Sequence, residues 1–209
     1  MNAERQLFRD FLTELEIPDP DQLMERFERY LQLLLEHNLA INLVSRATDP
    51  REYWTKHFLD SLMPLKVLEL TEDKALDFGS GGGLPGIPLK LARPGLKLSL
   101  LDSVGKKVRA LSQMADNLDL TDLELINARV EDHARSGRKY ELILCRAVKM
   151  EERYRLPLWK LLAKGGRVIF YKALDTSDLD GLKPKLLISR DFSWGHRSLL
   201  SVERESLKL

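Results

Sequence analysis

The sequence has a single cysteine, no long apolar run and almost no net charge, and each shortage excludes a class of protein. Cys145 alone cannot form a disulfide within the chain or supply a metal site built from several cysteines. No window approaches the roughly 20 apolar residues that cross a bilayer. The first ten residues mix charged and apolar side chains, unlike the apolar core of a signal peptide. These features favour a cytoplasmic protein with no membrane partner and no bound metal.

The composition also excludes disorder and fibrous structure. Hydrophobic residues make up 44% of the 209 residues and charged residues 31%, with 12 glycines and 9 prolines. This composition is ordinary for a folded globular protein and excludes a collagen or a coiled coil. A chain of this length buries a real core. We expect one domain with an extension, and a monomer, because no exposed apolar stripe demands a dimer.

Charge is uneven along the chain although the net charge is only +1. Residues 1–37 carry nine acidic and four basic side chains, whereas residues 129–172 carry twelve basic and five acidic ones. Such asymmetry can mark a face that binds nucleic acid. Charges spread in this way also simply solvate a surface, so composition leaves both interpretations open.

The first third of the sequence has helical periodicity. Phe8, Phe11, Leu12 and Leu15 are spaced as one face of a helix that Pro18 ends. Three helices are predicted. The first lies around residues 8–15, and the second is capped by Asp19 or Asp21 and ends near Asn38. The third runs from Asp49 and Pro50 towards Leu62. The three helices form a helical extension over residues 1–70.

From residue 71 onwards, short apolar segments alternate with helical ones, which predicts an α/β domain over residues 71–209. The predicted strands are 75–78, 96–101, 123–126, 140–145 and 167–171. The predicted helical segments are 86–92, 106–118, a turn near 131, and 151–162 ended by Gly165 and Gly166. Segments 185–190 and 199–203 add antiparallel strands at one edge. The expected fold is a doubly wound, Rossmann-like, mainly parallel sheet with that antiparallel edge.

Four glycines follow the first predicted strand directly: Gly79, Gly81, Gly82 and Gly83. Glycine lets the backbone take positive φ angles and lets a ligand lie against main-chain amides at the carboxyl end of a strand. A plain turn rarely needs four glycines. We therefore expect this loop to contact a cofactor.

The loop is compatible with two cofactors. Gly81, Gly83 and Gly86 match the G-x-G-x-x-G spacing of a dinucleotide site, which would suit a nicotinamide-dependent oxidoreductase. Asp77, however, stands two residues before the first glycine, where its charge would repel a phosphate and attract a cation. The spacing of Asp77, Gly79 and Gly81 therefore resembles the loop of class I methyltransferases, whose cofactor S-adenosylmethionine carries an amino group and a sulfonium but no phosphate.

A second acid follows the second predicted strand. A carboxylate at Asp102 can accept hydrogen bonds from both hydroxyls of a ribose, and Ser103 adjoins it. Asp102 can instead act as a helix cap before Val104 and Gly105, ahead of the helix predicted over residues 106–118. Both cofactors contain a ribose, so Asp102 does not separate them.

Five strings occur in an order that resembles the ribosomal RNA small subunit methyltransferase G family, also called glucose-inhibited division protein B. The strings, which lie within residues 42–172, are NLVS at 42–45, HFLDSL at 57–62, GGGLPGIPLKLARP at 81–94, LLDSVGK at 100–106, and Arg146-Ala147. The resemblance implies a class I methyltransferase that uses S-adenosylmethionine and acts on 16S ribosomal RNA or the small subunit. The implied reaction is methylation of N7 of one guanine, number 527 in the standard numbering of that RNA.

The resemblance also implies cofactor contacts at the matching positions, which are Gly79, Leu84, Val130, Glu131 and Arg146. Val130 and Glu131 follow the third predicted strand, where class I methyltransferases recognise adenine. Two segments depart from the family pattern: Cys145-Arg146-Ala147-Val148, where Ser-Arg-Ala-Phe is common, and His196-Arg197-Ser198, where an Arg-His pair is usual. These departures affect the expected substrate contacts.

Guanine N7 carries a lone pair and no proton, so its methylation needs no general base, and no catalytic dyad is evident in the sequence. Arg146 is the candidate for lining both cofactor and base, although it can instead pair with Asp77. The candidate RNA contacts are basic residues expected near the cleft: Lys106, Lys107, Arg109, Lys149, Arg153 and Lys172. His57 and Asp60 are spaced to interact on one helix face, where a structural role is favoured over substrate contact. A non-catalytic RNA-binding module with the same fold remains a third possibility.

Overall fold

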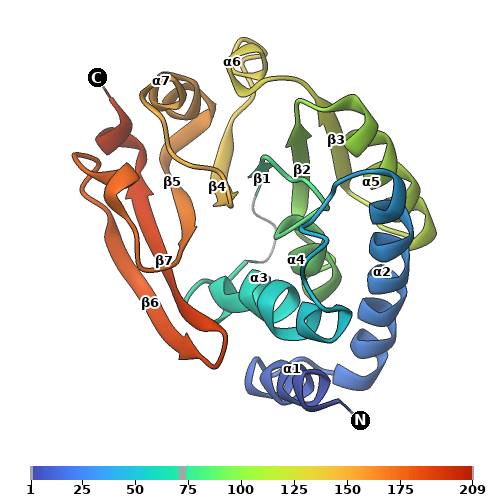
Figure 1. Cartoon of the computed structure of the whole chain (residues 1–209). Helices are drawn as coiled ribbons and strands as arrows, with labels where there is room; N and C mark the ends of the chain where they lie inside the picture. The colour runs from blue at the N-terminus through green and yellow to red at the C-terminus, as the bar shows by residue number, and fades with distance from the viewer. Residues whose placement is uncertain (1, 71–73, 209) are drawn as a thin grey trace.

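The computed structural model describes residues 2–70 and 74–208, and a sheet of seven strands lies at its centre (Figure 1). The strand order is β3-β2-β1-β4-β5-β7-β6. The strands are β1 (Lys74–Phe78), β2 (Lys97–Asp102), β3 (Leu123–Asn127), β4 (Tyr140–Arg146), β5 (Leu162–Lys172), β6 (Lys185–Phe192) and β7 (Gly195–Glu203). The first five are parallel, and β7 pairs antiparallel with both β5 and β6. The predicted doubly wound sheet with an antiparallel C-terminal edge is confirmed.

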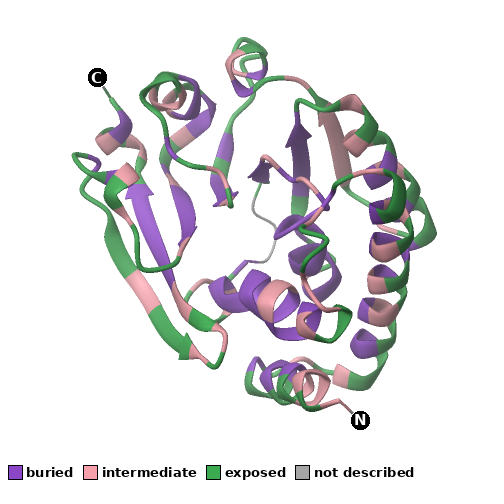
Figure 2. Cartoon of the chain, viewed as in Figure 1, coloured by how far each residue is buried: buried purple, intermediate pink, exposed green. Residues whose placement is uncertain are grey.

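The central strands are buried on both faces, which explains their almost continuous apolar sequences. In β1 all residues after Lys74 are buried, and in β2 all residues after Lys97 are buried. Neighbouring side chains point to opposite faces, so Ala75 belongs to one hydrophobic cluster and Leu76 to the other. Figure 2 shows this burial along the sheet and the exposed outer strand β6.

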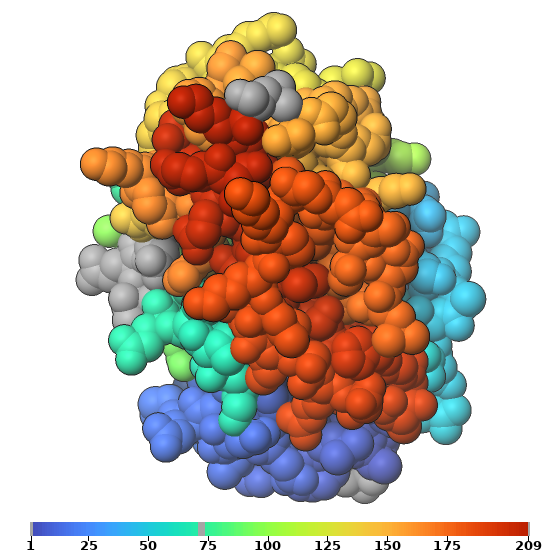
Figure 3. Space-filling view, turned by 90° about the vertical axis from the view of Figure 1, so that its left-hand side faces the viewer, coloured from blue at the N-terminus to red at the C-terminus, as the bar shows by residue number. Residues whose placement is uncertain are grey.

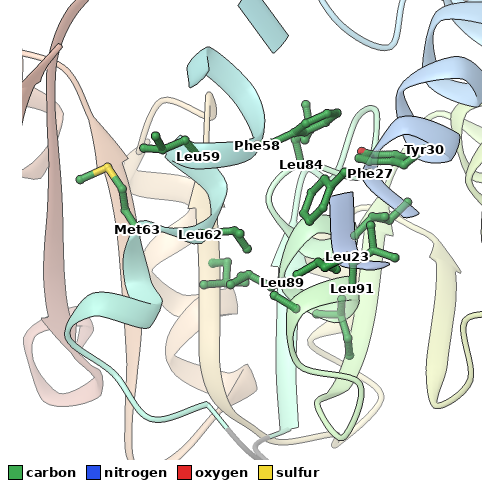
Figure 4. Packing of buried hydrophobic residues seen from close by; sticks show 14 of the residues in the cluster. Leu23, Phe27, Tyr30, Phe58, Leu59, Leu62, Met63, Leu84, Leu89 and Leu91 are labelled. Atoms are coloured by element: carbon green, nitrogen blue, oxygen red, sulfur yellow. The ribbon is translucent and has the colours of Figure 1, made fainter. Parts of the chain in front are cut away.

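The two N-terminal helices pack on one of these clusters. They are α1 (Ala3–Glu14) and α2 (Pro20–Ala40). The ring of Phe27 lies 4.8 Å from that of Phe8 and 5.0 Å from that of Phe58, centroid to centroid. Figure 4 shows Phe27 and Phe58 near Leu84, which precedes α4. The extension thus shares its core with the sheet, while a domain boundary at residue 70 stays a prediction.

Caps define where these helical segments begin. Asp19 accepts a hydrogen bond from the Gln22 amide at 2.9 Å, and Asp49 accepts one from the Arg51 amide at 2.9 Å. The single helix predicted from residue 49 to Leu62 is wrong in detail. The chain instead winds through a 3-10 turn (Pro50–Glu52), a π-helix (Trp54–Leu59), the short α3 (Asp60–Leu62) and a second 3-10 turn (Met63–Lys66). The π-helix widens the segment that carries His57, and π-turns often occur at functional sites.

The remaining helices connect the strands. They are α4 (Gly86–Ala92), α5 (Gly105–Asn117), α6 (Val130–His133) and α7 (Glu152–Leu161). The expectation that Gly165 and Gly166 end the last of these is wrong, because β5 begins at Leu162 directly after α7. Gly166 lies within that strand, where a side-chain Cβ would approach Glu141 O to 3.0 Å. Its close approach to β4 therefore explains the glycine better than a helix stop does.

The C-terminal strands cover one side of the molecule down to the N-terminal helices, as Figure 3 shows. Arg190 on β6 forms an ion pair with Glu14 on α1 at 3.7 Å. Phe192 also packs against the large hydrophobic cluster. Within the described ranges no helix is both long and apolar enough to cross a membrane.

Candidate functional site

Two adjoining cavities open at the carboxyl ends of β1, β2 and β4, where ligands bind in open α/β sheets. The first, which we call the central cavity, has a volume of 490 Å³. The second, the side cavity, has a volume of 320 Å³. Gly79 lines both cavities. A single elongated ligand that passes Gly79 would therefore occupy parts of both.

The glycine loop separates the two cavities, and its shape depends on glycine at Gly79. This residue has a φ of +79°, and a Cβ there would lie 2.5 Å from Val148 Cγ2. The backbone amides of Gly79 and Ser80 donate to Leu101 O at 2.9 and 3.1 Å. Tyr30 from α2 donates to Gly82 O at 2.7 Å, so the N-terminal extension helps to hold the loop.

Asp77 lies beneath this loop and lines neither cavity. The residue is fully buried, and its Oδ2 accepts a hydrogen bond from the Gly86 amide at 2.9 Å. Its Oδ1 is buried with no hydrogen-bond partner among the described residues. Burial raises the pKa of Asp77 to about 7, although the Gly86 amide and the charge of Arg146 oppose this rise. A buried carboxylate with one free oxygen is suited to a cation that binds near the loop.

The raised pKa of Asp77 predicts a pH-dependent cost in stability. Between the unfolded value near 4 and the folded value near 7, the folded state holds a proton that the unfolded state has lost. As the pH rises through this window, the contribution of Asp77 to the free energy of unfolding therefore falls, and above the window it no longer changes. Asp77→Asn removes the titration but keeps an oxygen acceptor for Gly86, so its stability relative to the parent should rise by about 2 to 3 kcal/mol from pH 5 to pH 7. Urea unfolding of both proteins at each pH measures this difference, and a difference independent of pH would contradict it.

Asp102 at the end of β2 holds two backbone amides. Its Oδ1 accepts a hydrogen bond from the Val104 amide at 2.9 Å, just before α5 begins, although α5 itself has no side-chain cap. Its Oδ2 accepts one from the Gly81 amide at 3.0 Å. A carboxylate has about four acceptor positions, so two remain for a ligand. Asp102 also lines the side cavity, together with Ser103.

The remaining wall of the side cavity comes from α6 and α7. Val130 and Glu131, for which the resemblance implied cofactor contacts, both line it, and Val130 is buried. Tyr154 on α7 also lines it and packs edge-on against Phe78, with ring centroids 5.2 Å apart. Tyr154 was not predicted, because only the folded chain brings α7 beside the end of β1.

Arg146 at the end of β4 lines the central cavity but not the side cavity. The alternative in which Arg146 pairs with Asp77 does not hold. Its Nε donates to Asp60 Oδ2 at 2.8 Å, and its Nη2 donates to Lys56 O at 2.9 Å and contacts His57 Nδ1 at 3.1 Å. Asp60 is 2% exposed. The NLVS and HFLDSL strings both contribute to this cavity, through residues 42–45, His57 and Asp60.

The two segments that depart from the family pattern contribute Ala147 and Arg197 to the central cavity and Val148 to the side cavity. Ala147 has a φ of +58°, which is uncommon outside glycine and costs backbone strain. Val148 lies against Gly79 and lines the side cavity. Arg197 from β7 lines the central cavity, and its Nε is 3.6 Å from Asp60 Oδ1. Cys145 is buried, and burial raises the pKa of its thiol to about 12, so it is no nucleophile.

The structure brings together some of the predicted site residues and not others. Gly79, Gly81, Leu84 and Arg146 line the central cavity, whereas Gly79, Asp102, Ser103, Val130 and Glu131 line the side cavity; Asp77 and Gly83 line neither. Of the predicted RNA contacts, Lys107 and Lys172 line the central cavity and Arg153 the side cavity, whereas Lys106, Arg109 and Lys149 line neither of these two. Lys172 is paired with Asp178, and Arg153 with Glu151.

Comparison with solved structures supports the fold. Among solved structures, a mutant of MtNAS in complex with S-adenosylmethionine superposes with a TM-score of 0.60 at 13% identity, over 95% of this chain and 77% of that one. A precorrin-6y C5,15-methyltransferase from Geobacter metallireducens gives a TM-score of 0.56 at 12% identity, over 71% of this chain and 88% of that one. At these identities the likeness concerns the fold alone. Fold and cavities together define a class I methyltransferase fold.

Sequence comparison identifies the family within this class. A family model described as rRNA small subunit methyltransferase G matches residues 23–191. Relatives named ribosomal RNA small subunit methyltransferase G include one from Oenococcus oeni, 36% identical over 79% of this chain and 71% of its own length. Another, from Alkalilimnicola ehrlichii, is 44% identical over 73% of this chain and 68% of its own length. The chain belongs to the rRNA small subunit methyltransferase G family. As a member of this methyltransferase family it uses S-adenosylmethionine as its cofactor, and the nicotinamide alternative is set aside.

Proposed function

We propose that this chain transfers the methyl group of S-adenosylmethionine to N7 of a guanine in the 16S RNA of the small ribosomal subunit. The family assignment supports an rRNA methyltransferase. The choice of N7, an atom whose methylation needs no base, rests on the groups that line the central cavity. This cavity is lined by polar groups beside Gly79, and its one histidine, His57, is held neutral and is bonded to Arg146 rather than to a nucleophile.

The residues of the two cavities fit the cofactor. Asp102 has two acceptor positions left for the two ribose hydroxyls, and Val130 with Tyr154 offers apolar walls for an adenine. The missing side chain at Gly79 leaves room between the cavities. The Oδ1 of Asp77 has no hydrogen-bond partner among the described residues, and a cation bound above the loop would favour the ionised form of this buried carboxyl. When bound, S-adenosylmethionine supplies an electrophilic methyl group on a positively charged sulfur.

The protein's contribution to the reaction is positioning. Guanine N7 attacks with a lone pair and releases no proton, so no group of the site has to act as a base. Alignment of two reacting groups is worth up to roughly 7 to 11 kcal/mol in favourable cases. Arg146 is fixed by three contacts to the segment that contains His57 and Asp60. It therefore presents a rigid wall of the central cavity to the base.

Binding to RNA should depend on the lysines at the start of α5. Lys106 is exposed and Lys107 lines the central cavity. Changing both to glutamate should weaken binding to small subunits by at least tenfold and flatten its salt dependence, because each lost phosphate contact removes roughly 0.7 to 0.9 from the log–log slope. Affinity for S-adenosylhomocysteine should not change. Filter binding at several salt concentrations, with calorimetry for the cofactor product, measures both.

The matched control reverses two exposed lysines that line neither cavity. Lys160 lies in the last turn of α7, and Lys164 lies near the start of β5. Their replacement by glutamate changes the net charge equally and should affect subunit binding far less. An equal loss in both double variants would mean that only total charge matters, and a loss of cofactor affinity in the α5 variant would make that cluster structural.

Mapping of methylated nucleotides tests the proposed function. RNA from cells with and without the gene should differ by one 7-methylguanosine in 16S RNA. Purified protein should restore that methyl group on subunits from the deleted strain. A difference at another atom or base would refute the choice of N7, and an absence of any transfer would favour a non-catalytic RNA-binding module. A cytoplasmic location, as expected for an enzyme of ribosomal RNA, and a monomeric state remain predictions.

A further inference from the structure

The contact with Arg146 fixes the protonation of His57. A guanidinium only donates hydrogen bonds, and Arg146 Nη2 lies 3.1 Å from His57 Nδ1. Nδ1 must therefore accept, which places the proton of the neutral ring on Nε2. Burial and the charges of Arg146, Lys56 and Arg197 lower the pKa of His57 to about 3, so the ring stays neutral near physiological pH. His57 is thus a hydrogen-bond donor of fixed orientation in the wall of the central cavity.

The Nε2 donor and a neighbouring acceptor are both unused. His57 Nε2 is buried with no hydrogen-bond partner among the described residues, and Asp60 Oδ1 is in the same condition. The Tyr53 ring packs edge to face on His57 at 4.8 Å, which holds the imidazole in place. Even an N–H that points at an aromatic face gains only a weak, second-order interaction, so the Tyr53 ring does not replace a hydrogen-bond acceptor for His57 Nε2–H. Leaving a buried donor unsatisfied costs about 1 to 3 kcal/mol, so a ligand that satisfies it is favoured.

The two unused atoms belong to one cluster. His57 and Asp60 both bind Arg146, through Nη2 and Nε respectively, and both line the central cavity. One offers a hydrogen and the other a lone pair. A planar base that presents an acceptor beside a donor would complement them. Guanine has this arrangement at its O6 and N1–H, whereas adenine has the reverse, an amino donor beside the N1 acceptor.

We propose that His57 and Asp60 select guanine in this cavity, with His57 Nε2–H donating to O6 and Asp60 Oδ1 accepting from N1–H. This rests on the proposed function and adds the residues that choose the base. Arg197 is the group that must give way, because its Nε is 3.6 Å from Asp60 Oδ1, too far for a hydrogen bond, and its side chain is 29% exposed. Product guanine gains positive charge, which strengthens its N1–H bond to the Asp60 carboxylate.

Substrate analogues test the proposal without any change to the protein. Small subunits are reconstituted with 16S RNA that carries guanosine, inosine or 2,6-diaminopurine riboside at the methylated position, and methyl transfer is measured as kcat/KM. Inosine keeps O6, N1–H and N7, so its rate should stay within about threefold of guanosine. Diaminopurine keeps N7 but reverses the donor and acceptor, and its rate should fall by roughly 10- to 100-fold, the effect of one unmatched buried hydrogen bond or more.

Replacement of His57 supplies the second arm. His57→Phe keeps a ring but no donor, and it should reduce the preference for guanosine over diaminopurine by about tenfold. His57→Gln keeps an N–H and should recover part of that preference. His37→Phe, on α2 and away from both cavities, is the control and should keep the full preference. Affinity for S-adenosylhomocysteine and thermal unfolding show whether each variant is folded.

The outcomes separate the claims. Wild-type protein that methylates diaminopurine as fast as guanosine overturns the proposal, even if His57→Phe does not fold. A His57→Phe protein whose rates fall by one factor on all three bases also overturns it, because that pattern belongs to a structural residue. Wild-type protein that methylates no guanosine in the subunit refutes the proposed function itself.

Discussion

Replacement of Arg146 by alanine is expected to destabilise the protein by about 3 to 5 kcal/mol and to abolish methyl transfer. The Arg146–Asp60 ion pair is almost fully buried, with side-chain exposures of 13% and 3%. Removing one partner of such a pair leaves an uncompensated buried charge, which is far more costly than losing a surface pair. Arg197, at 3.6 Å from Asp60 Oδ1, compensates only in part. Urea unfolding and a labelled-methyl assay on small subunits measure the two effects.

A second substitution at Arg146 shows which property of this residue matters, and a substitution at Arg155 is the control. Arg146→Lys keeps the charge but not the fork that reaches Asp60, Lys56 O and His57, so it should retain more stability than activity. Arg155→Ala removes an ion pair with the exposed Glu152 and should cost no more than about 1 kcal/mol. If Arg146→Ala were as stable and active as the parent, the cluster around Asp60 would not organise the site.

The second large effect is expected at Asp102. In Asp102→Asn the amide nitrogen must face either the Gly81 amide or the Val104 amide, so one donor opposes another. The variant also loses the charge that strengthens bonds to two ribose hydroxyls, each worth about 1.5 to 3 kcal/mol. Affinity for S-adenosylhomocysteine should fall by roughly 100-fold or more, as measured by calorimetry.

The control for Asp102 is Asp132→Asn on α6. Asp132 pairs with Arg135 and lines neither cavity, so the same chemical change there should leave cofactor affinity within about twofold. A normal affinity in Asp102→Asn would limit the role of Asp102 to holding the Gly81 and Val104 amides. A loss that appeared only as a lower unfolding temperature would point to the same conclusion.

The parts of the site predicted from sequence are those built by short segments. A strand, a run of glycines and an acid at a strand end are local patterns, and the loop at residues 79–83 and Asp102 follow from them. The mainly parallel pairing of the sheet also follows, because strands that alternate with helices favour a parallel sheet, whereas the order of the strands was not predicted. Most strand and helix bounds agree within a few residues. The exceptions are β5, which begins directly after α7, and residues 49–62, where one predicted helix is replaced by a 3-10 turn, a π-helix and the short α3.

The parts that sequence did not predict depend on distant segments. The cluster of His57, Asp60, Arg146 and Arg197 joins a π-helix, α3, β4 and β7, and no local spacing encodes that meeting. The π-helix itself has no evident sequence signal. Asp77 was expected to face the ligand directly, whereas burial places it beneath the loop on the Gly86 amide. In the sequence, the strings around residues 42 and 57 supported only the family resemblance, and their place in this cavity is seen in the structure.

A crystal structure with S-adenosylhomocysteine tests the central claim most directly. The account predicts the adenosine in the side cavity with both ribose hydroxyls on Asp102, and the sulfur near Gly79 at the entrance to the central cavity that His57 and Arg146 line. A ligand bound elsewhere would contradict the account, as would a structure in which a pyrophosphate rather than this compound occupies the glycine loop.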